Sequence, residues 1–291
     1  MPGQDRHHIS LGLFYGLATP VVASTATAAA KYLSTDLSPW FIVWVQYGLC
    51  SLIMLPWILR GGTRVLSSRR APLLIVRSLA GWLGFTTYFL ALPHIPLVDA
   101  TLLRAAAPLW VPLIVWLWAR EAIPGSRWIG LIGGFAGILL VLQPSLDGVN
   151  GGHLLGALAG LALATSMATT RGLSTSEPAA RVLCYYFLIS FLASTPMGLV
   201  HLKPVAIELL PGLVYVGLSI FLTMVLYTRA YTHAPTTVVA PLSYIAVPLS
   251  GLLDWWFWQT LPNTLALGGS VLVIGSGIVT VALSARTRSE H

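Results

Sequence analysis

The chain has 291 residues, of which 56% are hydrophobic and only 9% are charged. Soluble domains carry about 25% charged residues, so composition excludes an ordinary soluble domain and indicates a chain surrounded by lipid. The net charge of +7 does not indicate nucleic-acid binding, because the basic residues lie in short loops rather than on one face. The two cysteines, Cys50 and Cys184, lie in apolar segments without metal or redox spacing.

Ten mostly apolar runs follow one another along the chain, each close to the roughly 20 residues that a membrane-crossing helix needs. We predict spans at 10–32, 38–59, 72–93, 98–118, 126–143, 152–171, 181–201, 207–229, 236–258 and 264–284. Glycine and proline mark most of the short connections, and the runs lack the alternation of barrel strands. The sequence therefore predicts an all-α membrane protein with ten transmembrane helices, the first of them a retained helix rather than a signal peptide.

The basic residues predict the orientation of these spans. With the N-terminus in the cytoplasm, all but three of the 16 lysines and arginines fall on the cytoplasmic side, among them Arg77 at the start of the third span. The exceptions are Lys31 and Lys203, on the opposite side, and Arg104, inside the fourth span. Because cytoplasmic loops carry an excess of Lys and Arg, we expect both termini to be cytoplasmic.

The chain repeats itself at a shift of about 140 residues, as repeat architectures do. Three matches in register carry the repeat: Tyr88–Pro96 with Tyr227–Pro235, Pro108 with Pro248, and Glu121–Pro124 with Gln259–Pro262. We expect two units, 1–145 and 146–291. Because each holds five spans, the second unit enters the membrane from the opposite side, and the two are inverted repeats. Such repeats are typical of secondary transporters, which bind the substrate near the membrane midplane between the halves.

The first unit holds an ordered set of motifs: the Arg77–Gly81 opening, the Tyr88–Pro96 hairpin, Pro108-Leu109 and Glu121. Their order and spacing resemble the EamA unit of the drug/metabolite transporter superfamily, and residues 212–283 look like its second copy. One departure is Gln259, which stands where the first copy has Glu121. The resemblance implies a ten-helix exporter of small metabolites, similar to bacterial amino-acid exporters of the inner cell membrane. We expect no catalytic residue, metal or cofactor.

Arg104 is the leading candidate for substrate binding, because a charge inside a membrane span must face a cavity or a partner. We expect it to anchor a substrate carboxylate by bidentate hydrogen bonds. The alternatives are that it extends outward or pairs with Asp99. Aromatic and hydroxyl groups at middle depth supply the other candidates, for each of which helix packing is the competing role: Trp44, Trp82, Tyr88, Ser166, Tyr185, Tyr227, Ser243 and Tyr244.

Pro108 and Pro248 are candidate hinges, because proline removes a backbone donor and bends a helix; inert kinks are the alternative. Acidic side chains are absent from the predicted midplane: Asp99 and Asp254, for example, fall near the outer boundary. Proton-driven transporters use acidic or histidine relays inside the membrane, so we expect facilitated transport.

The predicted function is export of small metabolites by alternating access, with amino acids favoured and lipid-linked or sugar-like metabolites as the alternative cargo. An intramembrane enzyme is disfavoured because histidines and acids do not cluster at one depth; an accessory membrane subunit is also disfavoured. The stripe Gly152-x-x-x-Gly156-x-x-x-Gly160 permits close approach of helices. We expect it to serve packing inside one chain, and the protein to be a monomer or weak dimer.

Overall fold

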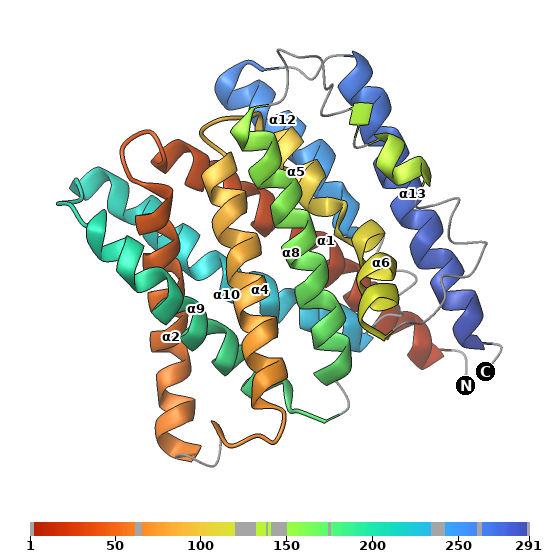
Figure 1. The fold of residues 1–291 in the computed structure, drawn as a ribbon, viewed down its shortest axis with the longest axis horizontal. Coiled ribbons are helices and arrows are strands. Elements are labelled where there is room, and N and C mark those ends of the chain that lie inside the picture. Colours follow the sequence, from red (N-terminus) through yellow and green to blue (C-terminus); the bar gives the residue numbers. More distant parts are fainter. Residues whose placement is uncertain are drawn as a thin grey trace.

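The computed structural model describes residues 3–61, 66–119, 132–137, 139–140, 150–173, 176–233, 242–260 and 264–289, which form helices and no strand (Figure 1). The helices are α1 (Gly3–Leu33), α2 (Pro39–Gly61), α4 (Ala71–Ala91), α5 (Leu97–Ala105), α6 (Ala107–Ala119), α8 (Gly151–Leu173), α9 (Ala179–Val200), α10 (Leu210–His233), α12 (Ala246–Trp258) and α13 (Thr264–Ser289). Two short 3-10 turns, η1 (Ile207–Leu209) and η2 (Ser243–Ile245), precede α10 and α12. The all-helical prediction is confirmed for this part of the chain.

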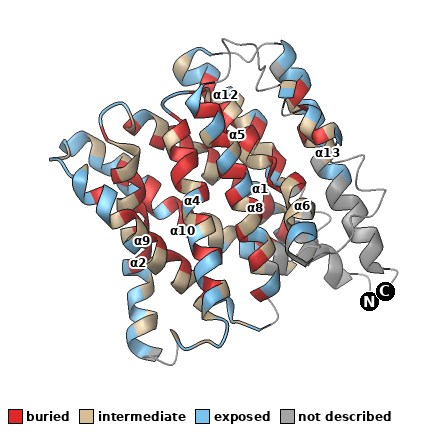
Figure 2. Ribbon diagram, in the orientation of Figure 1, coloured by how far each residue is buried: buried red, intermediate tan, exposed pale blue. Residues whose placement is uncertain are grey.

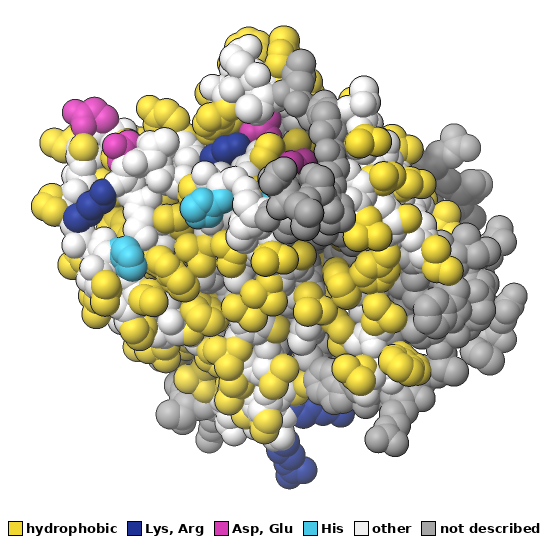
Figure 3. Space-filling view, turned by 45° about the horizontal axis from the view of Figure 1, so that its top comes forward, with side chains coloured by type: hydrophobic (Ala, Val, Ile, Leu, Met, Phe, Trp, Pro, Cys, Tyr) yellow, Lys and Arg dark blue, Asp and Glu magenta, His cyan; other side chains and the backbone are white. Residues whose placement is uncertain are grey.

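Six of the helices are long and apolar enough to cross a membrane: α1, α2, α4, α8, α9 and α10. Their outward faces carry large apolar side chains, such as Leu59, Leu192 and Val200, which are 73%, 67% and 77% exposed. Figure 3 shows hydrophobic side chains spread over the face in view, with charged side chains nearer its upper and lower parts. Such a surface suits lipid rather than water, so this is a helical membrane protein.

The predicted fourth span, 98–118, is two helices. α5 ends at Ala105 and α6 begins at Ala107. Pro108 explains the break, because its nitrogen has no hydrogen to donate to the carbonyl of Arg104, four residues earlier. The described part of the ninth span behaves likewise: η2 precedes α12, and Pro248 cannot donate to the carbonyl of Tyr244. Most of the fifth span and the start of the ninth lie outside the described residues.

The core lies in the middle of the bundle, where Figure 2 shows the buried residues of α1, α2, α4, α5 and α8 gathered together. The most extensive helix pairs are α4 with α8 and α1 with α10. Each pair joins a helix of the unit predicted at 1–145 to a helix of the unit predicted at 146–291. The two stretches of sequence are therefore interlocked rather than set side by side.

The glycine stripe of α8 packs against α5, as expected for contact within one chain. A Cβ added to Gly160 would lie only 2.4 Å from the carbonyl oxygen of Leu103, and one added to Gly156 would lie 2.8 Å from a methyl group of Leu103. Real Cβ atoms do not approach a backbone oxygen so closely, so only glycine permits this contact. The stripe fixes α5, and with it Arg104, against α8.

A second set of contacts joins the segment before α4 to the segment between α8 and α9. The Ser68 hydroxyl donates to Glu177 Oε1 (2.5 Å), and Arg181 Nη1 lies 2.6 Å from Glu177 Oε2. The Tyr185 hydroxyl donates to the carbonyl of Leu66 (2.6 Å). Tyr185, a predicted substrate contact, therefore joins α9 to the segment before α4.

We expect Gly160→Ala to lower the free energy of unfolding by about 1–3 kcal/mol, the usual cost of overpacking, because the added methyl group meets backbone. Gly151→Ala is the matched control, since a Cβ at Gly151 has nothing within 4 Å. Thermal unfolding of both variants in detergent tests the prediction. Equal melting temperatures for the two would contradict it.

The Glu177 contacts predict a pH dependence of stability. Hydrogen bonds from Ser68 and then Arg181 hold the pKa of Glu177 below its usual range. A lowered folded pKa means that the stabilisation is present above the pKa of the unfolded chain and is lost as the pH falls through the folded pKa. We expect Glu177→Gln to reduce the drop in melting temperature between neutral pH and about pH 4. Glu208→Gln, at an exposed position of η1, should leave that drop unchanged.

Candidate functional site

Arg104 lies in the last turn of α5, directly before the break in the fourth span. Its guanidinium packs over two rings of α4, with Cζ 4.4 Å from the centre of Phe85 and 5.0 Å from that of Tyr88. Its Nε is buried without a hydrogen-bond partner, and the structure shows no ion pair between Arg104 and Asp99, both of which it describes. The aromatic rings attract the charge but do not neutralise it.

A second arginine, Arg77, is buried in α4 with 7% of its surface exposed. Its Nε donates to Thr170 Oγ1 of α8 (3.2 Å), and its Cζ lies 4.3 Å from the ring centre of Tyr186 in α9. Its Nη1 is buried without a partner. By its position in the sequence, Arg77 is grouped with the cytoplasmic charges at the ends of the spans; the structure places its side chain not in a loop but among α4, α8 and α9.

The spacing of Arg77 and Gly81 in the sequence is related to the burial of the Arg77 side chain. A Cβ at Gly81 would lie 2.7 Å from the Tyr186 ring. Glycine one turn after Arg77 therefore lets that ring lie flat against α4, beneath the guanidinium. Arginine favours such stacking on aromatic faces, so the motif builds a ring platform for a buried cation.

Tyr186 joins the buried Arg77 to α2. Its ring centre lies 4.3 Å from Cζ of Arg77. Its hydroxyl is 2.8 Å from that of Tyr47 in α2, and the two fully buried rings meet edge to face, with centres 5.5 Å apart. We name Tyr47, Arg77, Tyr88, Arg104 and Tyr186 the arginine–tyrosine cluster. It draws on α2, α4, α5 and α9, and it places two cations in the interior of the bundle.

Several other buried polar atoms in the described residues have no hydrogen-bond partner. They include Trp82 Nε1, Thr86 Oγ1, Gln46 Oε1 and the Tyr244 hydroxyl. Trp82 and Thr86 lie on the same face of α4 as Phe85, whose ring packs against the guanidinium of Arg104. Buried polar groups are nearly always paired in proteins, so the unpaired atoms of Trp82 and Thr86, on the helix face that meets Arg104, are groups that a polar solute could bind. In the part of the chain described, no three His, Cys, Asp or Glu residues could hold a metal ion.

The remaining side chains predicted to contact substrate either pack between helices or lie at the surface. Trp44 packs between α2 and α9: its Nε1 donates to Thr195 Oγ1 (3.2 Å), and a Cβ at Gly198 would lie 2.4 Å from its Cγ. The Ser166 hydroxyl donates to the carbonyl of Arg77 (3.3 Å) and so supports the cluster. Tyr227 is 40% exposed on α10, and Ser243 is exposed in η2.

Comparisons with known proteins place the chain in a family. A family model described as the EamA-like transporter family matches residues 10–143 and again residues 150–282. A pseudopaline exporter of Pseudomonas aeruginosa is 27% identical over 275 residues, covering 94% of this chain and 95% of the relative. An S-adenosylmethionine uptake transporter of Rickettsia bellii is 25% identical over 267 residues, covering 91% of each chain. A riboflavin transporter of Vibrio cholerae is 24% identical over 298 residues, covering 98% of each.

A solved crystal structure gives a TM-score of 0.60 at 19% sequence identity, covering 97% of this chain and 99% of its own. That likeness shows a shared fold. The relatives named above are transporters, and the two family matches together span most of the sequence. The chain therefore belongs to the EamA-like transporter family, as a multi-pass membrane transporter of small metabolites and not an enzyme.

Proposed function

We propose that this transporter exports small metabolites that carry a carboxylate, with amino acids as the favoured class. One observation carries the proposal: the buried Arg77 and the half-buried Arg104 stack their guanidinium groups on aromatic rings and contact no carboxylate among the described residues. Arg104 anchors the carboxylate, and Trp82, Tyr88 and Tyr244 contribute to the same site.

The physical argument starts from the cost of a cation away from water. A buried charge costs several kcal/mol unless it is paired, and a desolvated cation–π contact returns on the order of 2 kcal/mol. Guanidinium presents a planar fork of donors that matches a carboxylate in a bidentate pair. A bound carboxylate would therefore supply the charge that the core lacks, and a cationic solute would be rejected.

The proposed architecture has ten transmembrane helices in two inverted units, 1–145 and 146–291, with both termini cytoplasmic and the protein in the bacterial inner membrane. The two family matches, at 10–143 and 150–282, support two units. The breaks support hinges at Pro108 and Pro248. Arg104 and Tyr244 each lie four residues before one of these prolines, and each has a buried polar atom without a partner. Equivalent positions of the two units thus contribute to one site, which alternating access exposes to each side in turn.

We further propose that transport is facilitated rather than proton-coupled. No acidic side chain in the described residues pairs with Arg77 or Arg104. The relatives named for pseudopaline, S-adenosylmethionine and riboflavin support testing cargo other than amino acids, including lipid-linked or sugar-like metabolites.

The first test is uptake into proteoliposomes of radiolabelled amino acids, S-adenosylmethionine and riboflavin, with and without an imposed pH gradient. We expect saturable uptake without a gradient. We expect Arg104→Ala to lower it at least tenfold at low substrate concentration, a loss of about 1.4 kcal/mol. Arg104→Lys should retain part of the uptake, because lysine keeps the positive charge but lacks the planar fork of donors. Arg69→Ala, at an exposed turn before α4, is the control. Uptake that requires the gradient would overturn facilitated transport.

A stability measurement separates binding from folding as the role of Arg104. Replacing an unpaired buried charge by an apolar side chain relieves its desolvation. We therefore expect Arg104→Met to keep or raise the melting temperature in detergent while uptake falls. A lower melting temperature together with lost uptake would instead identify Arg104 as a residue required for the fold.

A further inference from the structure

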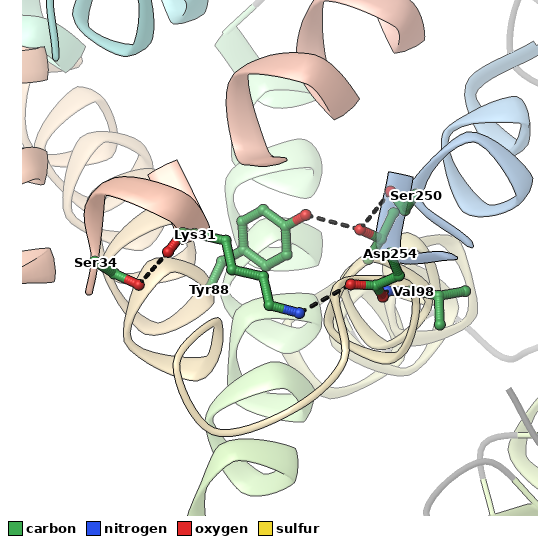
Figure 4. A network of polar contacts seen from close by, with 7 residues as sticks. Lys31, Ser34, Tyr88, Val98, Ser250 and Asp254 are labelled. Carbon is green, nitrogen blue, oxygen red and sulfur yellow. Dashed lines mark hydrogen bonds and ion pairs between the residues drawn. The ribbon is translucent and has the colours of Figure 1, made fainter. Parts of the chain in front are cut away.

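An ion pair lies at the end of the molecule where α1 ends and α5 begins (Figure 4). Lys31 Nζ, in the last turn of α1, lies 2.9 Å from Asp254 Oδ1 of α12. The Asp254 side chain is fully buried, and that of Lys31 is 12% exposed. The other oxygen of Asp254 accepts the backbone N–H of Val98, in the first turn of α5 (2.8 Å). The Lys31 ammonium also lies 4.5 Å from the ring centre of Trp258. Asp254 thus joins three helices.

A second connection lies one helical turn deeper. The hydroxyls of Thr101 in α5 and Ser250 in α12 are 2.9 Å apart, and the Tyr88 hydroxyl of α4 is 2.9 Å from that of Thr101 (Figure 4). Thr101 lies three residues after Val98 on α5, and Ser250 lies four residues before Asp254 on α12. At these spacings Thr101 shares a helix face with Val98, and Ser250 shares one with Asp254. The ring of Tyr88 lies under the guanidinium of Arg104. Contacts therefore run from Arg104 through Tyr88 to Thr101 and Ser250, which lie one helical turn from Val98 and Asp254 on α5 and α12.

We propose that Lys31, Val98, Thr101, Ser250 and Asp254 form a gate that closes one end of the transporter, and that Tyr88 connects this gate to Arg104. The inference rests on the alternating access of the proposed function. The gate joins α1 and α5 of the first unit to α12 of the second, so it must separate if this end is to open. Opening of this end would therefore break the contacts among these five residues.

The chemistry of the pair suits a contact with two discrete states. Two charges that part inside a dry interior lose their attraction without regaining water, which is costly. Two charges that part into water are rehydrated. The two charges are therefore stable either when paired and buried or when apart and hydrated. A state in which they are apart but still dry is disfavoured, as a two-state element requires. Lysine suits this role, since its ammonium is strongly hydrated and sits on a flexible stem.

Ser24 provides a reporter behind the gate. It lies on α1 two turns before Lys31, on the same face, is 2% exposed, and its hydroxyl donates to the carbonyl of Ala246 at the start of α12 (3.3 Å). We would introduce Ser24→Cys into a chain whose two cysteines are replaced by Cys50→Ala and Cys184→Ala. A bilayer-impermeant methanethiosulfonate reagent would be applied to spheroplasts and, separately, to inverted membrane vesicles.

With the gate intact, we expect the new thiol to be protected from the gated side. Lys31→Met and Asp254→Asn should each raise its labelling rate at least tenfold from that side alone. The double variant should regain protection in part, because no unpaired charge remains. Tyr88→Phe should raise labelling by a smaller factor, because it removes only the hydroxyl that meets Thr101. Lys203→Met is the control: Lys203 is the chain's other lysine, and it donates to the backbone carbonyl of Asp36.

The gate is overturned if Ser24→Cys labels equally fast with the ion pair intact, if neither single variant changes the rate, or if Lys203→Met acts as Lys31→Met does. An unchanged rate in Tyr88→Phe overturns the connection to Arg104. Melting temperatures of all variants identify unfolding, which would expose the thiol to both sides. The labelling needs no substrate, so its result is independent of the cargo assignment, which the uptake experiments test.

Discussion

The structure depends on how it accommodates charge where water is excluded. An interior charge must be met by another charge, by a polarised group or by a bound solute. This chain uses different solutions at two depths. Lys31 and Asp254 neutralise each other at one end, whereas Arg77 and Arg104 rest on the faces of aromatic rings with their charge intact. The first arrangement is complete without a ligand, and the proposed carboxylate substrate would complete the second.

Much of this could be predicted from the sequence, because the determining signals are local. Apolar runs of sufficient length predict helices wherever the structure describes them, and Pro108 marks the broken span because a proline removes a donor from its own helix. A charge inside an apolar run is visible in the run itself, so the sequence predicts that Arg104 lies among the helices, where it packs on Phe85 and Tyr88; its role in substrate binding stays a prediction. The family resemblance was likewise readable from the order of motifs, and it is confirmed.

Contacts between distant segments could not be predicted in this way. Arg77 lies near the start of its span, so by position it resembles a loop charge; its burial depends on α8 and α9, which no periodicity of α4 reveals. Tyr185 and Tyr186 are neighbours, but one residue turns a helix by about 100°, so Tyr186 enters the core while Tyr185 meets Leu66. Lys31 and Asp254 are 223 residues apart, and their pairing arises only from the fold.

The interlocked helix pairs limit how such a molecule can move. α4 lies along α8, and α1 lies along α10, so each unit of sequence holds a helix of the other. Moving the two units apart as rigid blocks would separate α4 from α8 and α1 from α10, and the packed surfaces of both pairs would lose their contacts. Bending at Ala106 and at η2 leaves both pairs intact. If the proposed hinges at Pro108 and Pro248 operate, the rigid bodies are delimited by the broken helices and not by the boundary between the two proposed units.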